Sequence, residues 1–143
     1  MALTSAPLLA LWIFQVVSSS HGQEVVRAHP GQDVTLKCQA PNNVSIIVLE
    51  WSRPDLEPEY VFFYREGRSY LSYQNPSFAG RVELIDREMK NGNLSLSLKN
   101  VSRNDAGTYE CRVVTGGTRR RKRANIDTEP SSTIILMVEG EFS

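Results

Sequence analysis

The sequence predicts an all-β domain, an antiparallel two-sheet sandwich closed by one disulfide bond. Three observations support this prediction: short segments in which apolar and polar residues alternate, turn residues between these segments, and a single pair of cysteines. Alternation with a period of two is typical of strands that bury one face. No sustained helical periodicity is present, and at most a brief turn is expected over 87–90. The length of 143 residues allows one ordinary domain and not two.

The first 22 residues have the pattern of a secretory signal peptide. They contain no Lys, Arg, Asp or Glu, and an apolar run over 8–17, broken only by Gln15, precedes the sequence SSSHG at 18–22. The small residues there suggest a cut before Gln23 or before His21. A run of about ten apolar residues is too short to span a hydrocarbon core of roughly 30 Å. We therefore expect residues 1–22 to be cleaved, the domain to occupy 23–139 and a short tail to follow over 140–143.

The strands can be assigned in chain order from the alternation. They are expected at 25–28, 34–39, 46–52, 60–65, 68–73, 82–85, 94–98, 107–114 and 133–138. Turn-forming pairs lie between them, including Pro30-Gly31, Glu66-Gly67 and Asn91-Gly92. The segments at 60–65 and 68–73, joined by Glu66-Gly67, are read as a short hairpin.

Two cysteines and two aromatic residues indicate how the sheets are joined. Cys38 and Cys111 fall at inward positions of their strands, and a disulfide closing so long a loop would stabilise the fold by roughly 4 kcal/mol. Trp51 also points inward and can pack on this bridge. Tyr109, in the motif Asp105-x-Gly107-x-Tyr109-x-Cys111, is placed to hydrogen-bond backward at the corner between the sheets. Together these residues indicate an immunoglobulin-type sandwich.

Further motifs give a more specific resemblance. They are Glu50-Trp51-Ser52-Arg53, Phe63-Tyr64-Arg65-Glu66-Gly67-Arg68 and Phe78-Ala79-Gly80-Arg81-Val82-Glu83-Leu84. With them, residues 24–139 resemble an immunoglobulin V-set domain, whose two extra strands are the hairpin at 60–73. Within that superfamily the chain is similar to butyrophilin-like receptors and myelin oligodendrocyte glycoprotein, and also to the coxsackievirus and adenovirus receptor.

The resemblance has implications for structure and for function. It implies that Arg81 pairs with Asp105 across the bottom of the sandwich. It also implies a cell-surface role in recognition, adhesion or the modulation of T cells, through the sheet face formed by the strands at 133–138, 107–114, 46–52 and 60–65. Unlike those receptors, the chain as given shows no transmembrane segment and no second domain. A secreted protein and a truncated membrane receptor both remain open, so we expect either secretion or a place on the extracellular side of the plasma membrane.

Three Asn-x-Ser sequons fit an exported protein. They begin at Asn43, Asn93 and Asn100, whereas Asn75 is excluded because Pro76 follows it. Each occupied site would keep its local surface exposed to solvent.

The composition argues against several function classes. The chain has 16 Lys and Arg against 16 Asp and Glu, so its total charge gives no reason to expect a nucleic-acid partner. Neither His21 nor His29 is positioned as a catalytic base, and both cysteines are committed to the disulfide. Glu57 and Glu59 on a proline-bounded loop are expected to be solvated rather than catalytic. We therefore expect no enzyme, no metal and no cofactor.

The alternation predicts an unusually apolar outward face on the strands named above. The residues expected on it are Ile46, Val48, Phe62, Tyr64, Glu110, Arg112, Val114, Ile135 and Met137. On the strand at 60–65, the neighbours Val61 and Phe63 could replace Phe62 and Tyr64 on that face. Apolar and aromatic residues with a few charges are typical of a protein interface. The alternative is that the long loops fold over part of this face.

A basic run, Arg119, Arg120, Arg121, Lys122 and Arg123, lies between the last two strands. It could bind a polyanion such as heparan sulfate, it could be a furin-type cleavage sequence, or it could be a solvated loop. Outside this run the chain has 11 cations against 16 anions, a net charge of −5.

Two functions remain. The first is a recognition module that binds a cell-surface receptor, or a second copy of itself, through the outward face. The alternative is a secreted polyanion-binding or decoy domain that acts through the basic run.

Overall fold

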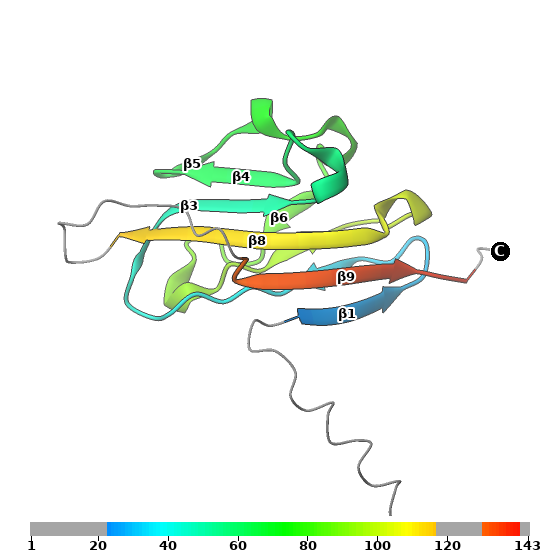
Figure 1. Ribbon diagram of the computed structural model, residues 1–143, viewed down its shortest axis with the longest axis horizontal. Helices are drawn as coiled ribbons and strands as arrows, with labels where there is room; N and C mark the ends of the chain where they lie inside the picture. The colour runs from blue at the N-terminus through cyan, green and yellow to red at the C-terminus, as the bar shows by residue number, and fades with distance from the viewer. Residues whose placement is uncertain (1–22, 117–129, 141–143) are drawn as a thin grey trace, which may run out of the picture.

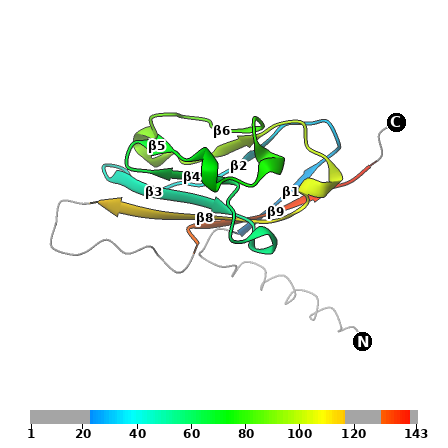
Figure 2. The same ribbon diagram turned by 90° about the horizontal axis from the view of Figure 1, so that it is seen from above.

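Two stacked β-sheets form the domain in a computed structural model that describes residues 23–116 and 130–140 (Figures 1 and 2). The larger sheet has six strands in the order β1-β9-β8-β3-β4-β5. Their bounds are β1 Gln23–Ala28, β9 Ser132–Val138, β8 Gly107–Gly116, β3 Ser45–Ser52, β4 Phe62–Arg65 and β5 Arg68–Ser69. The smaller sheet has the order β2-β7-β6, with β2 Val34–Leu36, β7 Leu96–Leu98 and β6 Val82–Leu84.

A strand is present at each position expected from the sequence in the described part of the chain, but of the segment expected at 68–73 only Arg68–Ser69 is strand and Leu71–Tyr73 is a 3₁₀ turn. The strand expected at 34–39 ends at Leu36, and the one expected at 94–98 begins at Leu96. Beyond these ends the two segments still meet in an isolated bridge between Gln39 and Asn93. The tight turn between β4 and β5 has positive φ at both Glu66 and Gly67, as a two-residue hairpin requires.

One strand pair departs from the antiparallel prediction. β1 runs parallel to β9, with Val25 beside Ile135 and Arg27 beside Met137. The chain then leaves this sheet at Pro30-Gly31, where Gly31 has φ 93° and its N–H donates to the carbonyl of Val101. The first strand therefore extends the larger sheet past β9, and the next strand begins the smaller sheet.

Short 3₁₀ helices connect the strands in place of α-helices. They are Pro54–Leu56, Leu71–Tyr73, Pro76–Phe78, Lys90–Gly92 and Arg103–Asp105. The brief turn expected over 87–90 is present, with the amide of Met89 donating to the carbonyl of Asp86, and the 3₁₀ turn Lys90–Gly92 follows it. Among the described residues no helix is long and apolar enough to cross a membrane.

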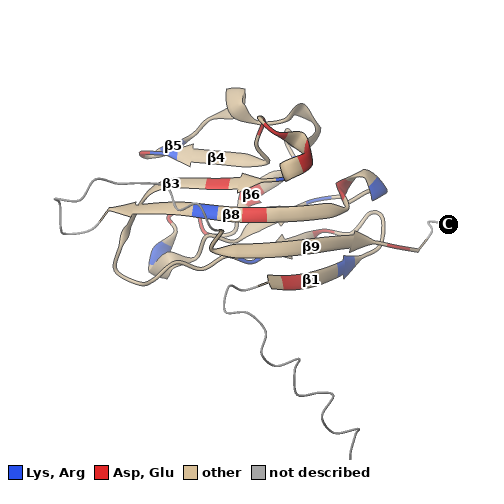
Figure 3. Cartoon of the chain, viewed as in Figure 1, with Lys and Arg blue, Asp and Glu red and all other residues tan. Residues whose placement is uncertain are grey.

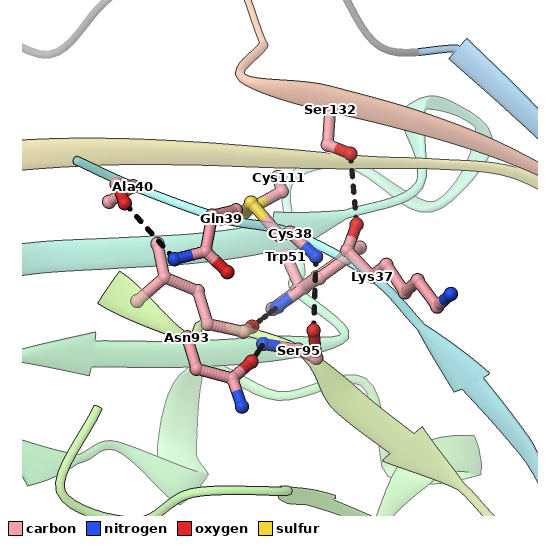
Figure 4. Close-up of a disulfide and its surroundings, with 10 residues drawn as sticks. Lys37, Cys38, Gln39, Ala40, Trp51, Asn93, Ser95, Cys111 and Ser132 are labelled. Carbon is pink, nitrogen blue, oxygen red and sulfur yellow. Dashed lines mark hydrogen bonds between the residues drawn. A yellow bond between two sulfur atoms is a disulfide. The ribbon is translucent and has the colours of Figure 1, made fainter. Parts of the chain in front are cut away.

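The core lies between the sheets around the disulfide. Cys38 and Cys111 are bonded with their Cα atoms 6.5 Å apart and 73 residues between them in sequence, so the predicted bridge is confirmed. Trp51 is fully buried beside it, and its indole N–H donates to the carbonyl of Leu94 at 3.1 Å, which ties β3 to the other sheet (Figure 4). Ser95 accepts a hydrogen bond from the amide of Cys38 in the same layer.

The corner below the core has the predicted tyrosine geometry. The Tyr109 hydroxyl donates to the backbone carbonyl of Asp105, and the carboxylate of Asp105 lies 2.8 Å from Arg81 Nη2. The Arg53 guanidinium lies 5.5 Å from the centre of the Tyr109 ring. The ion pair implied by the family resemblance is therefore present.

Candidate recognition surface

The strand registers determine which side chains of the six-stranded sheet point away from the core. Trp51 is opposite Cys111 in the core, so their neighbours Glu50 and Arg112, also opposite one another, point away from it. We call the resulting surface the outer face. Its side chains on the strands include Val25, Arg27, Val48, Glu50, Ser52, Phe63, Arg65, Arg68, Thr108, Glu110, Arg112, Val114, Thr133, Ile135 and Met137.

The predicted outward orientation of Ile46 is wrong. Ile46 is opposite Thr115 and Val48 is opposite Val114, so β3 contains one extra residue, Ile47, at this point. Such a bulge reverses the side on which the preceding residues point. Ile46 consequently packs against the core, while Val48 remains on the outer face.

The predicted outward orientation of Phe62 and Tyr64 on strand β4 is also wrong. These residues pair with Trp51 and Leu49, which are inward, and both pack against the core. Phe63 pairs with Glu50 instead and lies on the outer face. The second of the two readings left open by the sequence is therefore correct for Phe63, whereas Val61 is a core residue with only 1% exposure.

The centre of the outer face is polar and partly buried. Glu110 Oε1 lies 2.8 Å from Arg112 Nη1, with both side chains less than a quarter exposed. The Tyr60 hydroxyl donates to Glu50 at 3.5 Å. Burial raises the pKa of the Glu50 carboxyl, although the charge of Arg112 and the Tyr60 hydrogen bond oppose the rise. Figure 3 shows the acidic and basic segments side by side on β3 and β8.

A cluster of four aromatic rings lies on the β4 side of this centre. Phe63 is in the middle, with its ring centre 4.9 Å from that of Tyr60, 4.8 Å from Tyr73 and 5.8 Å from Tyr70. The alternation pattern does not mark Tyr70 and Tyr73 as residues of the outer face. Their spacing of three residues was the available signal, because the 3₁₀ turn Leu71–Tyr73 brings both rings to the same side.

Two arginines extend the aromatic cluster. The guanidinium of Arg65 lies 5.8 Å from the Phe63 ring centre and 5.3 Å from that of Tyr70, and Arg68 lies 5.0 Å from Tyr70. A hydrogen bond with Tyr70 raises the pKa of the Arg65 guanidinium. We call the six residues Tyr60, Phe63, Arg65, Arg68, Tyr70 and Tyr73 the β4 patch.

A strip of apolar side chains lies at the opposite side of the outer face. Val25 is 50% exposed and Met137 is 39% exposed, with Ile135 half-buried beside Val25. Val114 is outward as predicted but only 7% exposed, so little of its side chain is accessible. The accessible apolar area of this strip therefore comes from β1 and β9 rather than from β8.

The sequons do not fall on the strand positions of the outer face. Asn43 is in the loop before β3, Asn93 bridges to Gln39 beside the smaller sheet, and Asn100 follows β7. Asn43 and Asn100 are exposed, and Asn93 is partly exposed. Glycans at Asn93 and Asn100 would extend from the smaller sheet and its connections.

Three sequence predictions lie outside the described residues, in whole or in large part. They are the signal peptide at 1–22, the tail at 140–143, and the basic run Arg119, Arg120, Arg121, Lys122 and Arg123. Cleavage of the leader, cleavage of the basic run and heparan sulfate binding therefore stay predictions from the sequence.

Comparison with known proteins decides the family. Residues 21–128 match the family described as immunoglobulin V-set domain. The chain belongs to this family. V-set domain-containing T-cell activation inhibitor 1 of Rattus norvegicus is 34% identical over 99 residues, which cover 68% of this chain and 34% of that protein. Myelin-oligodendrocyte glycoprotein of Macaca fascicularis is 32% identical over 112 residues, covering 72% of this chain and 45% of that one.

A solved structure shows the same domain. The human B7-H4 IgV-like domain superposes with a TM-score of 0.60 at 30% identity, covering 80% of this chain and 91% of that chain. The V-set fold and the resemblance to myelin oligodendrocyte glycoprotein read from the sequence are thus confirmed. The V-set chain spans only about a third of the length of the T-cell activation inhibitor and under half of the glycoprotein.

Proposed function

We propose that this V-set domain is an extracellular recognition module that binds a cell-surface protein through the outer face of its six-stranded sheet. The observation that carries the proposal is the apolar strip of Val25, Ile135 and Met137 beside the charged pair Glu110 and Arg112. Exposed apolar area bordered by polar and charged side chains is typical of a protein interaction site.

The positions of the sequons support this choice of face. Asn93 and Asn100 belong to the smaller sheet and its connections, so their glycans would hinder a protein partner there. The outer face carries no sequon on its strands and would remain accessible. The signal peptide expected at 1–22 fits the same extracellular setting.

The relatives suggest the process in which the module acts. One is named a T-cell activation inhibitor, so we infer that T-cell regulation is the process and that the partner is a protein on the T-cell surface. The domain would then act by recognition alone, without chemistry of its own.

Binding of the fluorescently labelled, multimeric chain to T cells tests the proposal. Met137→Asp should lower cell binding by at least roughly tenfold, because it buries a charge in the interface. Ile85→Asp is the matched control, since Ile85 is 51% exposed and follows β6 in the smaller sheet. Both variants should be secreted as well as the parent chain. Binding that survives Met137→Asp, or that is lost only with Ile85→Asp, would contradict the proposal.

A further inference from the structure

The β4 patch has an internal order that runs along strand β4. Arg65 and Arg68 stack on Tyr70, Tyr70 contacts Phe63, and Phe63 contacts Tyr60. Tyr60 in turn hydrogen-bonds Glu50. Cations thus stand at one end of a row of rings, and a carboxylate stands at the other.

The acidic end extends into a pocket. A cavity of about 340 Å³ is lined by Glu50, Glu57, Glu59, Tyr60 and Arg112 among others. Glu57 and Glu59 are exposed, and Glu59 is held in place by the side-chain amide of Asn75 at 2.8 Å. Three carboxylates against one guanidinium leave this pocket acidic.

The two ends therefore carry opposite charge on one continuous surface. Figure 3 shows acidic residues in the connection from β3 to β4, whereas the β4–β5 hairpin carries both signs. There the two arginines Arg65 and Arg68 flank the single exposed Glu66, so this end keeps an excess of positive charge. Along the chain, Glu59 and Arg65 lie on either side of Phe63, whose ring contacts both that of Tyr60 and the guanidinium of Arg65. Consider a two-fold axis that lies in this surface, perpendicular to β4 and close to Phe63. Rotation by 180° about it places a second copy face to face with the first, with the acidic end of each copy opposite the basic end of the other.

A surface with that property is complementary to a copy of itself. We propose that the β4 patch is the contact of a symmetric dimer of this chain, in which Arg65 and Arg68 of each copy reach the acidic pocket of the other. A two-fold contact uses the same patch on both subunits, and each contact then occurs twice. The two β4 strands run antiparallel, and Tyr70 of one copy meets Tyr60 of the other.

The side chains involved are suited to such a contact. Tyrosine and arginine are enriched among residues that dominate binding energy. Here the guanidinium groups are already held over aromatic rings, so less side-chain freedom is lost on association. Tyr73 is 39% exposed and the neighbouring Leu71 is 74% exposed, which provides apolar area next to the charges.

This inference deepens the proposed function by naming a partner for one part of the outer face. It rests on that face being a recognition surface, but it uses β4 and β5, whereas the apolar strip lies on β1 and β9. Self-association is measured on the purified chain without cells, so its failure is distinguishable from a failure of T-cell binding.

Sedimentation of the secreted chain over a concentration series, combined with charge reversal, tests the dimer. The variant Arg65→Glu/Arg68→Glu places like charges at both contacts, and so does Glu57→Arg/Glu59→Arg. Each variant alone should dissociate at least roughly tenfold more readily than the parent chain. An equimolar mixture of the two should recover the association, because each variant then presents the charges that the other requires.

The control is Lys37→Glu/Lys90→Glu, which makes the same change of net charge at two exposed residues away from the patch. It should associate like the parent chain. The inference is overturned if the parent chain is monomeric up to roughly 1 mM, if the mixture fails to recover the association, or if the control variant loses it equally.

Discussion

Arg81 and Asp105 form a bidentate ion pair at the end of the sandwich where Tyr109 makes its corner. Arg81 Nη2 lies 2.8 Å from Asp105 Oδ1, and Nη1 lies 3.0 Å from Oδ2. The same carboxylate accepts the amide of Ser102, and the arginine also donates to the carbonyl of Lys99. The pair therefore joins the segment before β6, the end of β7 and the turn before β8 in one polar network.

Arg81→Ala should lower the free energy of unfolding more than the loss of an exposed ion pair does. Asp105 is 3% exposed, so loss of its partner leaves a buried and uncompensated charge, which costs about 3 kcal/mol of unfolding free energy. Lys99→Ala is the comparison, because Lys99 pairs with Glu83 and both side chains are about half exposed. It should cost less than about 1 kcal/mol. Chemical denaturation measures both, and equal effects would show that the Arg81 pair is not the stabilising contact described above.

Tyr109 should make the fold sensitive to alkaline pH. Burial raises the pKa of its phenol from 10 to about 12, although the nearby Arg53 opposes the rise. Between these values the unfolded chain releases the proton and the folded chain retains it. The free energy of unfolding should then be unaffected by this group below pH 10 and should fall by about 2 kcal/mol between pH 10 and 12.

Tyr109→Phe provides the control for that pH dependence. It removes the hydroxyl that donates to Asp105, so it should cost about 1 kcal/mol at neutral pH. From pH 10 to pH 12 the parent chain should lose about 2 kcal/mol of unfolding free energy relative to the variant, so that the variant becomes the more stable of the two. A constant difference across that range would exclude a raised pKa for Tyr109.

The bulge in β3 predicts that two neighbouring substitutions destabilise the fold to different extents. Ile46→Asp places a charge against the core and should lower the free energy of unfolding by about 2 kcal/mol or more. Val48→Asp places it on the outer face and should cost well under that amount. Thermal unfolding distinguishes them. If Val48→Asp lowers the melting temperature more than Ile46→Asp does, β3 does not have its bulge at Ile47.

The parts of the fold that the sequence predicts well are those that depend on local alternation and on rare residues. Leu49 and Trp51 alternate regularly into the core, and a pair of cysteines in an exported chain has one way to form an internal disulfide. Tyr109 is recognisable because its motif places it two residues before Cys111. These features require no knowledge of which strands are neighbours.

The missed features depend on pairing between strands. Nothing in the sequence of β3 distinguishes Ile47 as the extra residue, since Ile46, Ile47 and Val48 are all β-branched and apolar. In β4 the run Val61-Phe62-Phe63-Tyr64 is apolar at each position, so alternation cannot select which side faces inward. The register with β3 decides this, by placing Phe62 opposite Trp51. Tyr70 and Tyr73 join the β4 patch through a 3₁₀ turn that the sequence did not predict.

An aspartate scan of both sheet surfaces measures the central claim most directly. Each solvent-facing strand position of the two sheets is replaced by Asp in turn, and the displayed variants are sorted for folding and for binding to T cells. We predict that well-folded variants that lose binding cluster at Val25, Ile135 and Met137 on the outer face. Losses clustered on the smaller sheet, at positions such as Thr35 and Ser97, would contradict the account.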